Sequence, residues 1–449
     1  MRYKNIFAIF MMLTGVLFAS CTEEFFEPEL SSSKSTDQVS SINDLNALLY
    51  GALTRMSEPE LYGRDLIILG DIRSDNALSN GKSGRFVTDN QFVYTSNGAR
   101  ALDVWTKGYE VIASANIIIN SETEDKDTPE VKYVKGQAYA LRALMHMNLL
   151  TLYGQQYTGG TEGVPIVTKF LENFTPVRSP VQEVWEQIGA DIEEARKLVD
   201  PELDPNTSTV PGSMMVEALA SRYFLYTENW EKAKEAALNV INANAYSLIS
   251  SAGYASNWVK DETSNAIFEI GMNDTDNADI NGLYQILGNT NYGDVEITTD
   301  LYEQFEAGDA RKTIYSKSDG VHRSLKHIAF STNVKVFTYA EVLLNYAEAL
   351  MRLNDPEALN ALNVIPVAMG ATPYAVANED NVLLERRKEL AMEGFRFYDL
   401  MRTQRDIPKV DPRQRYDDGG IPYGSSKLVL PIPQAEIDAN PQIAQNKDY

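Results

Sequence analysis

Residues 385 to 402, ERRKELAMEGFRFYDLMR, form the stretch of sequence that decides the expected fold. Apolar residues recur at helical spacing from just before this stretch to its end; they are Leu383, Leu384, Leu390, Phe397, Leu400 and Met401. We therefore predict one amphipathic helix with this stripe against a core. The charged residues of the opposite face are expected to lie in solvent; they are Glu385, Arg386, Lys388 and Glu389. Gly394 costs about 1 kcal/mol relative to alanine inside a helix, so its presence indicates that another segment crosses closely there.

The same stretch resembles a known family signature. Written as E-R-R-x-E-L-x-x-E-G-x-R-F/W-x-D-L-x-R, it is similar to the signature helix of the SusD/RagB family, the surface nutrient-binding lipoproteins of Bacteroidetes. The matching positions are Glu385, Arg386, Arg387, Glu389, Leu390, Glu393, Gly394, Arg396, Asp399, Leu400 and Arg402. Phe397 stands where the family usually has tryptophan. The resemblance indicates kinship, but a structural signature names no ligand.

The composition is that of a well-packed globular protein. The chain has 449 residues, of which 44% are hydrophobic and 23% are charged. Its formal net charge is -23. A surface of this sign repels phosphate backbones and anionic lipid headgroups, which argues against nucleic-acid binding and against membrane docking through basic residues.

The N-terminus is typical of a lipoprotein export signal. Arg2 and Lys4 precede an apolar run from residue 6 to residue 19 that is too short and wrongly flanked for a membrane-spanning helix. Cys21 is the only cysteine and follows Leu-Phe-Ala-Ser, which resembles a bacterial lipobox. We predict a signal peptide at 1–20 and lipidation of Cys21; a plain signal peptide that ends near a cysteine is the alternative.

A Ser-rich, acidic segment follows the predicted lipidation site. Residues 21–41 are expected to form a lipidated flexible tether, and two or more acyl chains would anchor the protein stably. The Thr-Glu-Glu that follows Cys21 resembles the acidic flank that sends Bacteroidetes lipoproteins to the cell surface. The predicted location is therefore the outer membrane, lipid-anchored and facing outwards.

The remainder, 42–449, is expected to be a single large, mainly α domain. Apolar periodicity predicts a helical frame over about 102–244 and 337–402. Two short-linked helical pairs, at 213–241 and 338–365, resemble tetratricopeptide units, although no strict 34-residue period is visible and the repeat rests partly on the family. Loop-rich segments with a few short strands, such as 266–270, are predicted at about 58–100 and 245–336. A C-terminal arm at 427–449 contains Pro431 and Pro433, which prevent a regular helix there.

The sequence offers little support for catalysis. His146 lies in a predicted helix between two methionines, and His322 and His327 are five positions apart, which misses the i, i+4 spacing of two metal ligands on a helix. Nucleophile-elbow, phosphate-loop and dinucleotide motifs are absent from the sequence. We predict no catalytic residues, no metal and no cofactor. A pair of carboxylates could still serve a glycan hydrolase, because the chain has 63 acidic residues.

The two loop-rich segments carry the residue types that bind sugars. Aromatic faces stack on the C–H side of a pyranose, and amide, carboxylate and guanidinium groups bond its hydroxyls. The predicted ligand residues are Arg73, Asp75, Asn76 and Tyr94 in the first segment and Tyr284 and Tyr292 in the second. Trp105, Trp185 and Trp230 lie on predicted helices and are interpreted as structural, while the role of Trp258 stays open.

The resemblance also implies a function. It implies a surface protein that captures an oligosaccharide and delivers it to a SusC-like TonB-dependent porin for import. Three alternatives remain open: a RagB-like lid that binds peptides, a surface glycan hydrolase, and a structural scaffold without a small ligand.

Overall fold

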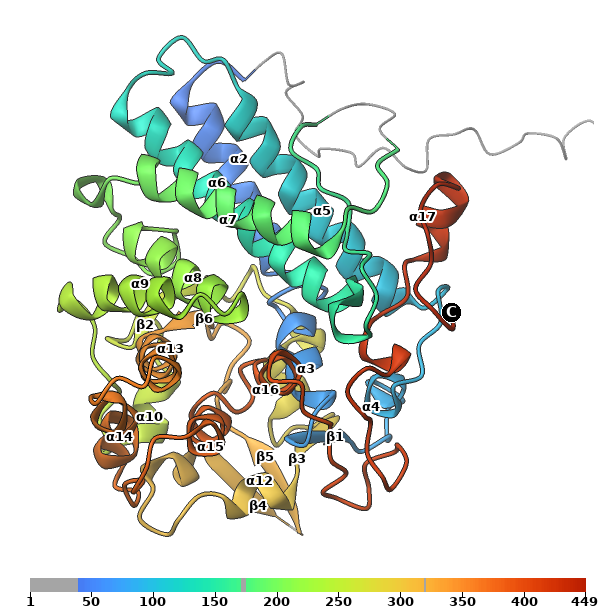
Figure 1. Cartoon of the computed structure of the whole chain (residues 1–449), viewed down its shortest axis with the longest axis vertical. Helices are drawn as coiled ribbons and strands as arrows, with labels where there is room; N and C mark the ends of the chain where they lie inside the picture. The colour runs from blue at the N-terminus through green and yellow to red at the C-terminus, as the bar shows by residue number, and fades with distance from the viewer. Residues whose placement is uncertain (1–38, 171–174, 319) are drawn as a thin grey trace, which may run out of the picture. The chain divides into compact units, whose positions relative to one another are not determined.

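Helix α6 (Pro129–Tyr153) is the buried axis of the helical frame (Figure 1). The side chain of Thr128 caps its first turn by accepting a hydrogen bond from the amide of Val131, and Pro129 occupies the first helical position. Helices α5 (Ala99–Asn120) and α7 (Val181–Leu198) pack along α6, and α2 (Ile42–Met56) packs against α5. This computed structural model describes residues 39–170, 175–318 and 320–449. The predicted signal peptide, Cys21 and the tether up to residue 38 lie outside the described residues.

Helical pairs continue the frame, and they confirm the predicted mainly α, tetratricopeptide-like fold. Helix α8 (Ser213–Tyr226) packs against α9 (Trp230–Asn242), and α13 (Tyr339–Arg352) packs against both α9 and α14 (Ala358–Met369). The packing face of α9 consists of small, fully buried residues that allow close helix approach; they are Ala233, Ala236, Ala237 and Val240.

Short helices and 3-10 turns complete the helical part. The α-helices are α3 (Asp65–Ile72), α4 (Val87–Gln91), α10 (Tyr254–Trp258), α11 (Leu283–Leu287), α12 (Thr299–Glu303), α15 (Glu379–Glu389), α16 (Arg396–Arg402) and α17 (Gln434–Ala439). The 3-10 turns are η3 (Gln155–Tyr157), η4 (Pro201–Leu203), η5 (Asp279–Asn281), η6 (Ala310–Ile314) and η7 (Ser426–Leu428). Among the described residues, none of these helices combines the length and hydropathy that a membrane span requires.

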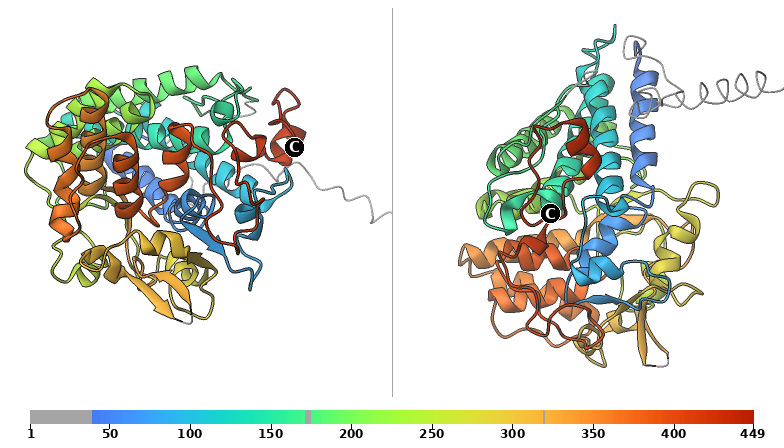
Figure 2. Two further views of the ribbon diagram at one scale, coloured as in Figure 1. Left: turned by 60° about the horizontal axis from the view of Figure 1, so that its bottom comes forward. Right: turned by 90° about the vertical axis from the view of Figure 1, so that its right-hand side faces the viewer.

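The two loop-rich segments meet in a small antiparallel sheet. Its strand order is β1 (Ala77–Ser79), β3 (Val295–Ile297), β5 (Val321–Ser324) and β4 (Tyr315–Ser318). A second pair joins β2 (Ala266–Ile270) to β6 (Val334–Thr338). Because β1 comes from the first segment and the other strands come from the second, backbone pairing brings residues about 200 positions apart into one layer. Both views in Figure 2 show this layer, drawn mainly in yellow, toward one end of the helical frame.

The signature stretch departs from the predicted single helix. Helix α15 ends at Glu389, α16 begins at Arg396, and Gly394 between them has a left-handed φ of +87°. The predicted close crossing is confirmed, because a Cβ on Gly394 would lie 3.0 Å from Cα of Ile67 and a Cβ on Gly70 would overlap the Gly394 backbone. Two chain segments therefore touch backbone to backbone at this point.

The prediction that the charged residues of the signature lie in solvent is wrong. Glu385, Arg386, Lys388 and Glu389 are all less than 5% exposed. Their burial is possible because residues outside α15 supply opposite charges. Nη1 of Arg311 lies 2.5 Å from Glu385 and 3.1 Å from Glu389, and Nε of Arg386 lies 2.9 Å from Asp399.

The C-terminal residues run along the end of α6 without a helix across Pro431 and Pro433. The amide of Leu430 donates to the Leu152 carbonyl at 2.8 Å. The side-chain amide of Asn446 donates to the carbonyls of Tyr153 and Leu430 at 2.8 and 2.7 Å. The bonds to Leu152 and Tyr153 satisfy carbonyls that the end of α6 leaves unpaired.

Candidate functional site

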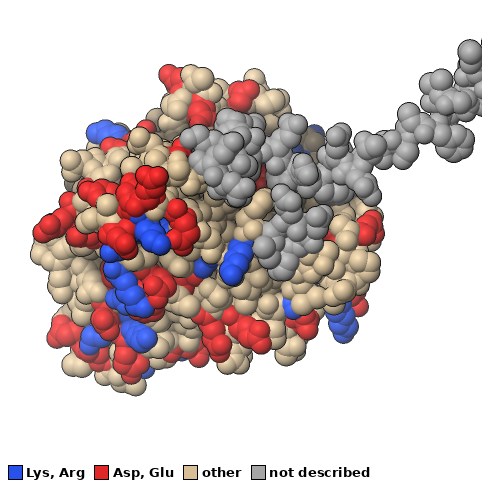
Figure 3. Space-filling view, turned by 90° about the horizontal axis from the view of Figure 1, so that it is seen from above, with Lys and Arg blue, Asp and Glu red and all other residues tan. Residues whose placement is uncertain are grey.

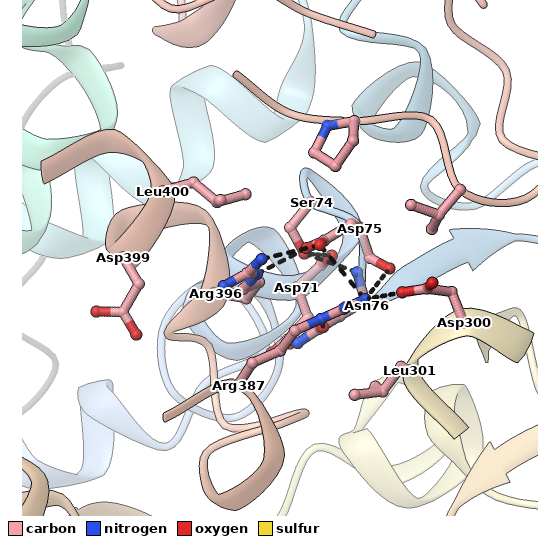
Figure 4. A network of polar contacts seen from close by, with 12 residues as sticks. Asp71, Ser74, Asp75, Asn76, Asp300, Leu301, Arg387, Arg396, Asp399 and Leu400 are labelled. Carbon is pink, nitrogen blue, oxygen red and sulfur yellow. Dashed lines mark hydrogen bonds and ion pairs between the residues drawn. The ribbon is translucent and has the colours of Figure 1, made fainter. Parts of the chain in front are cut away.

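The segment that follows α3 enters a buried polar network that joins it to the signature stretch (Figure 4). The carboxylate of Asp75 accepts two hydrogen bonds from the guanidinium of Arg396, at 2.7 and 2.9 Å, and lies 3.4 Å from Nη2 of Arg387. The amide of Asn76 donates to the Asp71 carboxylate at 2.8 Å, and its oxygen accepts from Nε of Arg387 at 2.9 Å. Two of the six predicted ligand residues are therefore bonded to the chain itself.

The arginines fix the charge state of Asp75. Burial acts to raise the pKa of the Asp75 carboxyl, but the charges of Arg396 and Arg387 outweigh burial and hold the pKa below its ordinary value. At Asp71 burial dominates and raises the pKa of the carboxyl. Asp75 is 2% exposed and Asn76 is fully buried. In this structure, the two side chains link the N-terminal and C-terminal halves of the domain rather than face solvent.

Arg73 and Tyr94 extend the same interior region. The guanidinium of Arg73 lies 3.9 Å from the centre of the Phe397 ring and 5.6 Å from that of Tyr94, and it donates to the Leu428 carbonyl at 2.5 Å. Arg73 is completely buried. Tyr94 is half-buried against the core, and its hydroxyl donates to the Asp89 carbonyl at 3.3 Å. Phe397, the residue that departs from the expected tryptophan, is thus the ring on which Arg73 stacks.

Tyr292 lies at the surface above an ordered arginine. Its side chain is 36% exposed, and the guanidinium of Arg85 lies 4.8 Å from its ring centre. Nη2 of Arg85 donates to the side-chain oxygen of Asn281 at 3.0 Å, while Nη1 lies 3.5 Å from the buried carboxylate of Asp294. Both Asp294 oxygens lack a hydrogen-bond donor among the described protein atoms. Arg85 is therefore held by Asn281 and Asp294 next to an exposed aromatic ring.

Tyr284 belongs to a neighbouring group of exposed apolar side chains. Its ring meets that of Phe330 edge to face, with centres 5.2 Å apart and planes at 89°. Phe330 is 37% exposed, Ile280 is 42% exposed and Ile328 is 50% exposed. Because Arg85 bonds to Asn281, the Tyr292 ring is tied to the segment that carries Ile280 and Tyr284. We call the combined set the aromatic surface: Arg85, Ile280, Asn281, Tyr284, Tyr292, Ile328 and Phe330.

Sequence reasoning placed two residues on this surface and missed the others. Arg85 comes from the first loop-rich segment, and Ile328 and Phe330 come from a stretch between β5 and β6. Their sequence neighbourhoods show no periodicity that separates exposed apolar residues from buried ones. Around Arg85, the glycines at 81 and 84 indicated a loop, where recognition residues tend to lie.

The histidines lie in the interior. Burial lowers the pKa of His146 and of His327 to about 3 in each case, so both are neutral at physiological pH. The ring of His322 stacks on Tyr302 with centres 4.1 Å apart. Within residues 39–449, apart from the two gaps, we find no group of three or more His, Cys, Asp or Glu side chains that could hold a metal ion.

On the face seen in Figure 3, acidic and basic side chains are interspersed. Such mixing gives a solvated surface with local ion pairs rather than a continuous field of one sign.

Two family models match the chain. The first, described as "Starch-binding associating with outer membrane", matches residues 25–225. The second, described as "SusD family", matches residues 318–449 and includes the signature stretch. The two matches lie on either side of the segment that carries Tyr284 and Tyr292.

Whole-chain comparisons agree with these models. The chain is 25% identical to SusD-like protein P38 of Formosa agariphila over 100% of both chains. A solved SusD superfamily protein from Bacteroides thetaiotaomicron is 26% identical, with a TM-score of 0.83 over 90% of this chain and 99% of that one. Another from Bacteroides vulgatus is 26% identical, with a TM-score of 0.84 over 91% of this chain and 99% of that one.

Proposed function

This chain belongs to the SusD/RagB family, and on that premise we propose that it is a cell-surface lipoprotein that binds carbohydrate. It captures an oligosaccharide outside the cell and delivers it to a SusC-like TonB-dependent transporter. The starch-binding description of the first family model supports the ligand class. The protein acts by binding, without catalytic residues.

The aromatic surface is the observation that carries this proposal. Tyr292 and Tyr284 present half-exposed rings, which suit the apolar face of a pyranose. Arg85 and Asn281 lie beside the rings and offer a guanidinium and an amide to sugar hydroxyls. Because Arg85 is already ordered by Asn281 and Asp294, binding requires little further side-chain ordering.

The other predicted ligand residues take a supporting role in this proposal. Arg73, Asp75 and Asn76 are buried and bonded within the domain, and Tyr94 packs beside Arg73. They hold the first loop-rich segment in place, and β1 within this segment pairs with β3, which follows Tyr292. Direct contact with the oligosaccharide is therefore assigned to the aromatic surface.

Lipidation at Cys21 and a lipidated tether over residues 21–41 complete the proposal. A diacyl or triacyl cysteine at the first mature position would hold the domain at the outer membrane. A tether of this length lets the domain approach the transporter while it stays anchored. Replacing Cys21 with serine should release the protein from membranes, and labelling of intact cells with a non-permeant biotin reagent should detect the wild type. Labelling only after lysis would contradict surface exposure.

A peptide ligand is the second candidate. Ile280 and Ile328 are 42% and 50% exposed, and they lie close in the sequence to Tyr284 and Phe330, whose rings are in contact. Such a group would also accept apolar peptide side chains. Neutral oligosaccharides and a peptide panel should therefore be titrated side by side.

Calorimetry on a double variant tests the assignment. We expect Tyr284→Ala/Tyr292→Ala to weaken oligosaccharide affinity at least tenfold, which corresponds to about 1.4 kcal/mol, because both rings lose their contact with the sugar. Tyr50→Ala is the matched control, since Tyr50 is 54% exposed and lies on α2, outside the aromatic surface. Unchanged affinity in the double variant would remove both tyrosines from the site.

A further inference from the structure

A second hollow lies on the helical frame, on elements that the aromatic surface does not use. It is a groove of about 680 Å³ between the start of α7, the end of α8 and the loop after η3. Its lining residues are Gly160, Thr161, Pro180, Val181, Gln182, Trp185, Glu186, Tyr223, Tyr226, Thr227 and Glu228, and we call it the frame groove. This volume lies within the range of about 300–1,000 Å³ that is usual for small-ligand sites.

Three aromatic side chains form the floor of the frame groove. The rings of Trp185 and Tyr223 have centres 6.0 Å apart and planes at 50°, so they make an angled platform. Tyr226 completes the row and is backed by the guanidinium of Arg402, 5.8 Å from its ring centre. All three aromatic side chains are half-buried, whereas Trp105 in the core is 2% exposed. The three rings thus pack against the core on one side and keep part of their surface accessible on the other.

The platform is ordered in advance by the two helices that carry it. The hydroxyl of Tyr223 donates to the Trp185 carbonyl at 3.0 Å. Gly189, inside α7, leaves the space for this hydroxyl, because a Cβ there would overlap it. Glycine in a helix interior costs about 1 kcal/mol relative to alanine. The position of the Tyr223 side chain therefore depends on Gly189, although glycine destabilises the helix that contains it.

The rim is polar and carries no basic residue among its described lining side chains. The amide of Gln182 donates to the Glu186 carboxylate at 2.9 Å, and both side chains are exposed. Glu228, on the opposite side, takes a left-handed backbone with φ of +57°. Carboxylate, amide and hydroxyl groups around an aromatic floor can bond sugar hydroxyls, while two carboxylates without a cation repel an anionic ligand.

From this arrangement we propose that the frame groove is a second carbohydrate-binding surface, which takes a neutral oligosaccharide. The concave form favours a small ligand over a protein partner, because protein interfaces bury about 800 Å² on each side and are usually flatter. The inference rests on the proposed function for its ligand class and goes beyond it in adding a separate surface. A chain with two such surfaces can hold a long glycan at two points, which raises its effective affinity.

The test uses the full mature chain with its aromatic surface disabled. In Tyr284→Ala/Tyr292→Ala, maltohexaose, cellohexaose, mannohexaose and xylohexaose are titrated by calorimetry and by tryptophan emission, with oligogalacturonate as the anionic comparison. We expect saturable binding of at least one neutral hexasaccharide, with a shift in emission. Adding Trp185→Ala should weaken that binding at least tenfold.

Two further variants keep the test decisive. Trp230→Ala is the matched control, because Trp230 is a half-buried tryptophan on α9 that does not line the groove, and it should leave the affinity unchanged. Gln182→Leu removes a rim amide that can bond sugar hydroxyls, at an exposed position and without removing a packed side chain, so it tests the site even if Trp185→Ala fails to fold. It should also weaken binding.

The outcomes separate this inference from the proposed function. Affinity within twofold of the starting value in Trp185→Ala and Gln182→Leu, or a preference for oligogalacturonate, would overturn the proposal for the frame groove. Complete loss of binding in Tyr284→Ala/Tyr292→Ala would also overturn it and would support the aromatic surface as the sole site. Binding that survives this double variant unchanged and disappears with Trp185→Ala would support the groove and overturn the aromatic surface. Failure of every probe to bind the wild type would overturn both.

Discussion

Replacing Asp75 with asparagine separates a structural role from a ligand role for this residue. The carboxylate accepts two hydrogen bonds from Arg396, at 2.7 and 2.9 Å, and also lies 3.4 Å from Arg387. Asp75→Asn keeps the shape but leaves the two cations without their shared anion. Breaking a buried ion pair on one side usually costs about 3–5 kcal/mol. We expect a loss of this size in the free energy of unfolding, measured by urea denaturation.

Asp300 provides a matched control because it contacts the same network from the surface. Its carboxylate lies 2.7 Å from Nη2 of Arg387, but its side chain is 34% exposed. Exposed ion pairs usually contribute less than about 1 kcal/mol. Asp300→Asn should therefore cost far less than Asp75→Asn. Combining Asp75→Asn with Arg396→Met should cost less than the sum of the two single variants, because the second change removes the stranded charge.

The pH dependence of the same variant follows from the lowered pKa of Asp75. A carboxyl whose pKa is lower in the folded state stabilises the fold above its unfolded value, near 3.9, and this contribution is lost as the pH falls through the folded pKa. The stability gap between wild type and Asp75→Asn should thus be constant near neutrality and narrow below about pH 4. A loss under 1 kcal/mol at pH 7, or a loss of oligosaccharide affinity in protein that is still folded, would refute the reasoning.

Two other predictions concern the signature stretch. Gly394→Ala should lower the free energy of unfolding by more than the control Gly84→Ala, because a Cβ on Gly394 would press on Ile67. Gly84 has φ of +83° and open space around it, so its replacement should cost only the about 1–2 kcal/mol of a left-handed backbone. Equal losses of the two variants in urea denaturation would contradict the close crossing. Burial raises the pKa of Glu393 to about 7 despite its ion pair with Lys326. The free energy of unfolding of the wild type should therefore fall relative to that of Glu393→Gln as the pH rises from about 4.5 to 7, by at most about 1.4 kcal/mol per pH unit. A flat difference between the two proteins across that range would contradict a raised pKa.

Helical periodicity predicted the frame because its evidence is local. The repeated apolar positions of α5, α6, α8 and α13 lie within a few turns of one another, and each helix buries the face that its own sequence defines. The close crossing at Gly394 was also predictable, since a glycine in an otherwise regular pattern indicates lost space for a side chain. These features need no knowledge of the partner segment.

The charged residues of the signature were placed wrongly because their partners lie outside their own helix, some of them far away in the sequence. Arg311, which neutralises Glu385, lies 74 positions earlier in a Gly-Asp-Ala-Arg turn. A periodic pattern predicts that charged residues face solvent, because it contains no information about opposite charges that other segments bring close in the tertiary fold. The same limit applies to Arg73 and Asp75, whose residue types suit a sugar equally well as they suit a buried network.

The arrangement of charges explains why the signature identifies the fold but not the ligand. The charged side chains of the signature form ion pairs within the domain. Arg396 and Arg387 pair with Asp75 in the first loop-rich segment, and Arg402 pairs with Glu348 on α13 at 2.6 and 2.7 Å. Substituting any of them would strand a buried charge, so their identities are tied to stability. The rings of Tyr284, Tyr292 and Trp185 carry no such constraint, because each is partly exposed and can change without leaving a buried charge unpaired. Ligand choice can therefore vary on a frame that the signature keeps fixed, which is why the signature identifies the architecture and the exposed rings must be tested one by one.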